Sequence, residues 1–142
     1  MDKTVLFLKF VSFTSSVHHV TNELTQKTKS DSITQVQYNI LKYIAINQPV
    51  SISKISDCLH ISMPNTSREL RKLIEKGLIE KIHDNEDRRK QYIRLSKNGE
   101  TMMNEAFACI QEHFLNRIQN TSKEDLEEIN HALDILQEKL FY

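Results

Sequence analysis

The chain has 142 residues, of which 39% are hydrophobic and 27% are charged, so it can form one compact domain with a core but not two ordinary ones. The apolar run from Val5 to Leu8 is too short for a membrane span or a secretory signal, so we expect a cytoplasmic protein with no membrane partner. The net charge is zero, yet residues 63–94 carry +3 and residues 100–142 carry −6. This asymmetry suits a protein that presents one face to a polyanion.

Only two glycines and two prolines are present, so the chain should be mostly helical with few tight turns. Gly77 and Gly99 stand too far apart to supply a phosphate-binding loop, a dinucleotide fingerprint or a Gly-x-Ser-x-Gly nucleophile elbow. We therefore predict a protein that is not an enzyme and that needs no cofactor.

Two helices are expected at the N-terminus. Apolar spacing predicts a first helix from about Lys3 to Lys27, ended by residues 29–32. Thr34 can cap a second helix, which Asn47-Gln48-Pro49 ends, and Val50 should be extended.

Two shorter helices joined by a tight turn should follow. Ser51 is a good N-cap for a helix that ends at His60, a residue type that tolerates a left-handed backbone. Ser62 can cap the next helix, and Gly77 stands where a glycine stop belongs. On a helical wheel, one side of this second helix is apolar and comprises Met63, Thr66, Leu70, Leu73 and Ile74.

The opposite side of that helix carries Asn65, Arg68 and Lys72, with Arg71 beside them. It is basic and rich in hydrogen-bonding groups. The alternative is that Arg68 or Lys72 pairs with a neighbouring glutamate on a solvated surface.

Seven polar residues, Asp84 to Lys90, stand between apolar runs at 77–82 and 91–96. This pattern predicts two strands joined by an exposed, charged hairpin tip. A hairpin of this kind, directly after a helix-turn-helix, is a known way to bind DNA, although alone it could be a solvated loop.

Two amphipathic helices should complete the chain, one starting at Ser96 and ending near residue 120, and one capped by Ser122. The last helix has leucines and an isoleucine in steps of three and four, an apolar seam suited to a partner subunit. With two residues of the first helix, the expected dimerisation residues are Val5, Leu8, Leu126, Ile129, Leu133, Leu136 and Leu140.

The order of these elements, together with the segments Leu73 to Ile79, Asp87 to Arg89 and Leu95 to Gly99, resembles the MarR family of winged-helix transcriptional regulators. The likeness spans essentially the whole chain. It implies a mainly α winged helix-turn-helix fold with about six helices, a small β-hairpin wing and an obligate-type dimer through the terminal helices. One structural domain would then comprise a dimerisation region, residues 1–48 and 100–142, and a DNA-binding region, residues 49–99.

The resemblance implies a sequence-specific regulator of double-stranded DNA. Asn65 and Arg68 suit base edges, while Ser67, Arg71 and Lys72 suit phosphates. In the wing, Arg89 would enter the minor groove and Asp87 would support the loop by pairing with arginine, and phosphate contacts are expected from Arg88 and Lys90. We expect a homodimer on a pseudo-palindromic operator, acting as a repressor that a small-molecule effector releases.

The sequence leaves two alternatives open. The winged helix could be a protein–protein interaction module, since fold alone does not fix function. A metal-responsive regulator could use Cys109 and His113, which share a helix face, although two ligands do not make a site and we expect no metal. Cys58 and Cys109 form no CxxC pair and are most simply two buried thiols.

Overall fold

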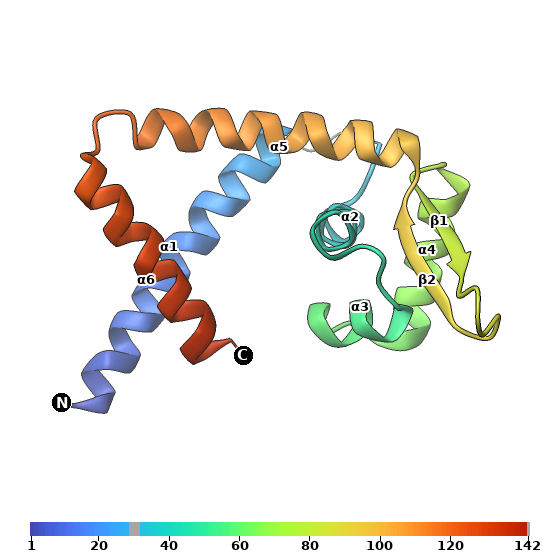
Figure 1. The fold of residues 1–142 in the computed structure, drawn as a ribbon, viewed down its shortest axis with the longest axis horizontal. Helices are drawn as coiled ribbons and strands as arrows, with labels where there is room; N and C mark the ends of the chain where they lie inside the picture. The colour runs from blue at the N-terminus through green and yellow to red at the C-terminus, as the bar shows by residue number, and fades with distance from the viewer. Residues whose placement is uncertain (29–31, 142) are drawn as a thin grey trace. The chain divides into compact units, whose positions relative to one another are not determined.

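The computed structural model describes residues 1–28 and 32–141, which form two compact units, Met1–Phe107 and Ala108–Tyr142. Within the described residues, the chain forms six α-helices and one two-stranded antiparallel sheet. The expected mainly α fold with one hairpin is thus confirmed (Figure 1). In chain order the elements are α1 (Lys3–Thr28), α2 (Gln35–Asn47), α3 (Ile52–Leu59), α4 (Met63–Glu75), β1 (Ile79–His83), β2 (Gln91–Leu95), α5 (Lys97–Arg117) and α6 (Lys123–Leu140).

The helix boundaries at α1 and α2 follow local signals. α1 matches its predicted bounds to within a residue at each end. The expected break at residues 29–31 lies outside the described residues, and Ser32 forms part of a turn. At α2, Thr34 Oγ1 accepts a hydrogen bond from Gln37 N at 3.1 Å, while Gln37 Oε1 accepts one from Thr34 N at 3.2 Å. This reciprocal capping box fixes the first turn of α2.

The helix pair α3–α4 forms as its caps predict. Ser51 accepts a hydrogen bond from Lys54 N, and Ser62 accepts one from Asn65 N. Between the two helices, His60 has the left-handed backbone (φ 53°, ψ 45°) that the tight turn requires. Gly77, at φ 72°, follows the end of α4, a conformation that glycine adopts without steric cost.

The hairpin pairs β1 with β2 in the register Ile79↔Leu95 to His83↔Gln91. Val50 extends this sheet by one bridge, because its N–H donates to Ile93 O at 3.0 Å and its carbonyl accepts from Ile93 N at 2.7 Å. The hairpin is therefore attached to the segment that precedes α3.

The core of the first unit is formed by α2, α3, α4, the hairpin and the start of α5, which lie together in Figure 1. Tyr38, Leu41 and Ile44 supply the α2 side of it. Burial of aliphatic and aromatic side chains is the main stabilising contribution to such a core. The other buried hydrophobic residues are Ile33, Ile40, Val50, Ile55, Leu70, Leu73, Leu78, Ile79, Ile93, Leu95, Met103 and Ala106.

The start of α5 is joined to the end of α4. Ser96 Oγ donates to Gly77 O at 2.6 Å and accepts from Gly99 N at 3.0 Å, and Ser96 N donates to Leu78 O at 3.0 Å. Gly99 lies so close to Leu78 that a Cβ atom there would stand 2.0 Å from the Leu78 carbonyl oxygen. The residues just after β2 therefore contact the residues just before β1, which joins the two ends of the hairpin.

The terminal helices bury little within the described residues. α6 has no buried residue, and Leu133 and Leu140 are each 55% exposed. On α1, Val5 and Leu8 are 50% and 59% exposed. Among the described residues, no helix is long and apolar enough to cross a membrane.

Candidate nucleic-acid interface

The outward face of α4 carries the side chains that the sequence singles out. Asn65, Ser67, Arg68, Arg71 and Lys72 are all exposed, while Thr66, Leu70 and Leu73 on the other side are buried. Lys72 Nζ lies 3.5 Å from Glu69 Oε1, so the pairing considered as an alternative does occur for Lys72. At this separation, and with the Lys72 side chain 50% exposed, the pair is weak.

Two residues expected on the buried side of α4 are exposed instead. Met63 is 46% exposed and Ile74 is 38% exposed. At about 100° per residue, both lie roughly 55–75° from the centre of the buried stripe, at its edge. The apolar contact surface of α4 is therefore narrower than its sequence pattern suggested.

The tip of the hairpin is closed by its own polar groups. Asp84 N donates to Lys90 O, and Lys90 N donates to Asp87 O, both at 3.0 Å. Asp87 Oδ1 accepts hydrogen bonds from Arg89 N at 3.0 Å and from Arg89 Nε at 3.3 Å. Asp87 thus holds both the backbone and the guanidinium of Arg89, whose side chain is 93% exposed.

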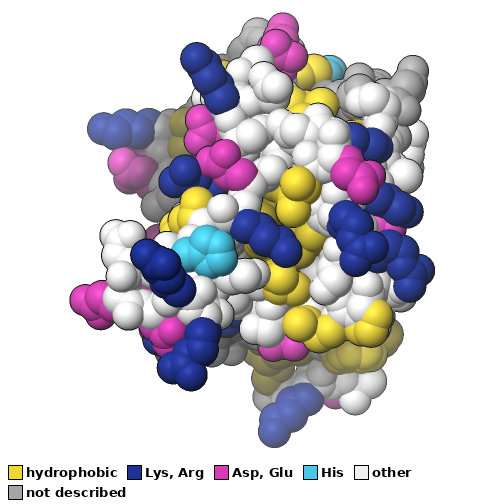
Figure 2. All heavy atoms as spheres, turned by 90° about the vertical axis from the view of Figure 1, so that its right-hand side faces the viewer, with side chains coloured by type: hydrophobic (Ala, Val, Ile, Leu, Met, Phe, Trp, Pro, Cys, Tyr) yellow, Lys and Arg dark blue, Asp and Glu magenta, His cyan; other side chains and the backbone are white. Residues whose placement is uncertain are grey.

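Arg88 and Lys90 are also exposed at this tip. Figure 2 views the side of the molecule on which the hairpin and α4 lie, and Lys and Arg side chains are distributed over it among fewer acidic ones. A strip of apolar side chains runs between them. Cations are therefore exposed on both α4 and the hairpin tip of the first unit.

Residues 33–90 match the family model described as MarR family. Over this stretch, which is less than half of the chain, the sequence is similar to the MarR family. The resemblance seen in the sequence is confirmed, and the winged-helix proteins of this family are regulators, not enzymes. A search of the curated proteins finds no significant match.

Solved MarR-type structures share the fold over nearly the whole chain. A MarR family protein from Bacillus stearothermophilus is 18% identical, with a TM-score of 0.79, over 100% of this chain and 99% of that one. Streptococcus pneumoniae FabT in complex with DNA is 20% identical, with a TM-score of 0.68, over 98% and 97%. Staphylococcus aureus MarR in complex with salicylate and kanamycin is 23% identical, with a TM-score of 0.69, over 98% and 92%.

A cavity of about 430 Å³ lies between α1 and α2. Its wall combines the cation of Lys42, several hydroxyl and amide groups, and an apolar part. It is lined by His18, Thr21, Asn22, Thr25, Gln35, Asn39, Lys42, Tyr43, Ile46 and Leu59.

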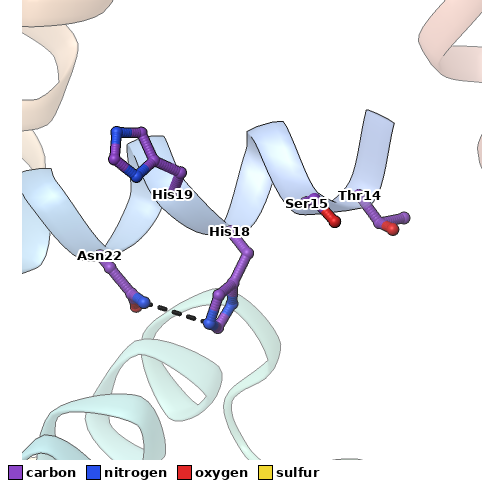
Figure 3. A pocket seen from close by; sticks show the side chains of 5 residues that line it. All are labelled: Thr14, Ser15, His18, His19 and Asn22. Carbon is purple, nitrogen blue, oxygen red and sulfur yellow. Dashed lines mark hydrogen bonds between the residues drawn. The ribbon is translucent and has the colours of Figure 1, made fainter. Parts of the chain in front are cut away.

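A second hollow lies on α1 alone (Figure 3). His18 and Asn22 point to the same side of the helix, where the Asn22 amide lies 3.1 Å from His18 Nε2, and His19 points elsewhere. One helix supplies all five of its residues, Thr14, Ser15, His18, His19 and Asn22, so it is no enclosed site.

The cysteines differ from expectation. Cys109 is partly buried, but Cys58 is exposed, and its Sγ accepts a hydrogen bond from Tyr43 Oη at 3.2 Å. The prediction of two buried thiols is wrong for Cys58 because it is turned by roughly 110° from the buried side of α3. In the described part of the chain, no group of three or more His, Cys, Asp or Glu residues could hold a metal ion.

Two polar residues that connect the helices, Gln37 and Lys76, were not predicted from the sequence. Gln37 is 2% exposed although it carries an amide, and it contacts both Glu69 and Lys76 of the α4 region. The pattern Thr34-x-x-Gln37 is a capping-box signal that could have identified the local half of this arrangement. No local sequence signal predicts the hydrogen bonds of Gln37 with Glu69 and Lys76.

Proposed function

We propose that this protein is a homodimeric, sequence-specific regulator of transcription that binds double-stranded DNA, acting as a repressor that a small-molecule effector releases. The observation that carries the proposal is the pairing, in one unit, of an exposed basic face on α4 with a wing tip whose Arg89 is held outward by Asp87. FabT, which has the same fold, was solved in complex with DNA.

The contacts divide by chemistry. Asn65 and Arg68 read base edges in the major groove, because amide and guanidinium groups make paired hydrogen bonds to adenine and guanine. Ser67, Arg71 and Lys72 contact phosphates, as do Arg88 and Lys90 at the wing. Arg89 enters the minor groove, where its weakly hydrated guanidinium meets a strong negative potential.

The partner subunit is a second copy of this chain. The apolar seam of α6 and the apolar face of α1 are exposed in the single chain, and a second copy would cover them. The two α4 helices of the dimer, related by a twofold axis, would enter successive major grooves about 34 Å apart, which requires a pseudo-palindromic operator.

A gel-shift titration on fragments of the source genome tests DNA binding. We expect one or a few fragments to bind selectively, and Arg68→Ala and Arg89→Ala each to weaken binding by about 1–3 kcal/mol. Arg117→Ala, near the end of α5 and outside the proposed interface, is the control and should bind normally. No selective fragment, or recovery of a stable hetero-complex without DNA binding, would instead favour a protein-interaction module.

The α1–α2 cavity is the proposed effector site. A ligand with an acidic group and an aromatic ring would match the Lys42 cation and the Tyr43, Ile46 and Leu59 wall. Staphylococcus aureus MarR was solved with salicylate, which has this chemistry. Such a ligand regulates only if it binds the DNA-free and DNA-bound arrangements unequally.

Salicylate and related aromatic acids should therefore raise the thermal midpoint of the free protein and release it from a selected DNA fragment. Lys42→Gln should reduce both effects while leaving DNA affinity without ligand unchanged. Ligands that raise the midpoint but leave DNA affinity unaltered would show binding without regulation and would count against the effector part of the proposal.

A further inference from the structure

The buried amide of Gln37 lies at the centre of a hydrogen-bonded group that joins α2 to α4. Its Nε2 donates to Glu69 Oε2 at 3.0 Å, and its Oε1 accepts from Lys76 Nζ at 2.9 Å. Lys76 Nζ also donates to Ser32 O at 2.6 Å, in the turn that precedes α2. We call Gln37, Glu69 and Lys76 the α2–α4 clamp.

Chemistry fixes the orientation of the central amide. If the carboxamide of Gln37 were turned over, its oxygen would face the Glu69 carboxylate and its NH₂ group would face the Lys76 ammonium and Thr34 N–H. An acceptor would then face an acceptor at Glu69, and donors would face donors at Lys76 and Thr34. Because Gln37 is 2% exposed, water does not readily substitute for these contacts. The Gln37 amide therefore has one stable orientation.

The clamp contacts α4 at Glu69 and the end of α4 at its C-cap residue, Lys76. Glu69 and Lys76 are seven residues apart, which corresponds to about 10 Å along a helix and to nearly the same side of it. On the helical wheel, this side lies roughly 65–85° from the centre of the buried stripe, between that stripe and the face carrying Asn65, Arg68 and Lys72. Attachment along that border opposes rotation of α4 about its own axis.

A small rotation of α4 would displace the long side chains of its outward face from base edges, where paired hydrogen bonds demand accurate placement. Phosphate contacts tolerate such displacement better, since they are largely a matter of charge. Loss of the clamp should therefore reduce sequence selectivity more than total affinity for DNA.

We propose that Lys76, through Gln37 and Glu69, is a positioning residue that sets the rotation of α4 for sequence reading and is not itself a phosphate contact. The inference rests on the proposed DNA-binding function. It separates Lys76 from Lys72, which lies four residues earlier in the last turn of α4 and whose amine makes a 3.5 Å contact with Glu69.

The test compares full-length Lys76→Met with wild type on two duplexes: one that wild type selects from random sequence, and one scrambled from it. We expect the selected-to-scrambled affinity ratio to fall roughly 5-fold or more, the effect of misplacing one good base contact. The slope of log affinity against log salt should stay at the wild-type value, because a phosphate contact contributes about 0.9 to it, and hence about 1.8 in a symmetric dimer.

Three further variants complete the design. Gln37→Met removes the acceptor without changing charge and should reproduce the loss of selectivity at an unchanged slope. Lys76→Arg retains a cation with several donors and should restore part of the selectivity. Lys72→Met is the matched control and should lower the slope while weakening both duplexes alike. Urea unfolding of each variant separates a loss of selectivity from a loss of folded protein.

The proposal is overturned if Lys76→Met lowers the slope by about 1.8 and weakens both duplexes equally, since Lys76 is then a phosphate contact. It is equally overturned if Lys76→Met leaves both quantities unchanged. Wild-type protein that selects no duplex overturns the DNA-binding function and the clamp's role in it, an outcome distinct from the other two.

Discussion

At the start of α5, the backbone oxygen of Leu78 occupies the space that a side chain on Gly99 would need. Gly99 is helical, so its role is close packing and not an unusual backbone angle. Gly77 is the reverse case, because a Cβ atom there would meet nothing within 4 Å, but its φ is 72°. The two glycines of this chain therefore serve different physical purposes.

Replacing Gly99 with alanine should destabilise the protein by about 1–3 kcal/mol, the usual cost of overpacking, because Leu78 or α5 must shift. Urea unfolding monitored by circular dichroism measures the change. Asn98→Ala, at the preceding exposed position, should alter the free energy of unfolding by less than about 0.5 kcal/mol. Equal effects of the two substitutions would contradict the packing argument.

Ser96→Ala should cost about 0.5–2 kcal/mol, because it removes the hydroxyl that caps α5 and bonds Gly77 O. Ser96→Thr keeps the hydroxyl and should restore most of the lost stability. Thermal and urea unfolding of the two variants test this pair. Destabilisation by Thr as large as that by Ala would show that packing around Ser96, and not its hydroxyl, is what matters.

At the scale of elements, the hairpin is joined to the rest of the unit at its base, and its outer face is held by exposed side chains. Arg94 Nε donates to Glu80 Oε1 at 2.6 Å across the directly paired position Glu80↔Arg94. Both side chains are about half exposed, at 51% and 47%, so solvent screens their attraction. The cross-strand pair should therefore stabilise the hairpin only slightly.

A double-mutant cycle with Glu80→Gln and Arg94→Gln measures that contribution. We expect a coupling energy of about 0.2–1 kcal/mol that shrinks as salt rises toward 1 M. Lys81↔Ile93, a neighbouring pair in the same register, offers Lys81→Gln as a control for the loss of one charge. A coupling that exceeds about 2 kcal/mol, or that salt does not reduce, would contradict a solvent-screened pair.

At the scale of the whole molecule, the described part of the chain leaves many apolar side chains exposed on its terminal helices. Leu6, Phe7 and Phe13 of α1 are each about half exposed or more, and so is Phe141 beyond α6. Exposed apolar surface of this kind marks an interaction site. Its distribution over α1 and α6 agrees with the proposed homodimer.

Leu133→Glu should convert the proposed dimer to monomer, because it places a charge in the centre of the α6 seam. Sedimentation equilibrium over a range of concentrations gives the association constant, and the thermal midpoint of wild type should rise with concentration while that of the variant should not. Glu128→Gln, on the same helix outside the seam, is the control. A dimeric Leu133→Glu protein would show that α6 does not form the interface.

Much of the fold could be predicted because its signals are local. Ser51, Ser62 and Gly77 each determine a helix end through contacts within a few residues, and His60 adopts the left-handed turn expected of it. The hairpin could be predicted from the two apolar runs on either side of its polar tip. Exposure of Asn65, Arg68 and Arg71 likewise follows from helical periodicity, and their contacts with DNA stay a prediction.

Only the tertiary structure decided the rest. The contacts of Gln37 with Glu69 and Lys76, 32 and 39 residues away, depend on how α2 packs against α4, and no local pattern encodes that packing. The exposure of Cys58, Met63 and Ile74 was decided in the same way, by which side of a helix its neighbours cover. The sequence by itself determined where elements begin, end and present polar faces, because caps and periodicity act over one or two turns. The structure decided which faces meet, because packing acts between residues far apart in the chain.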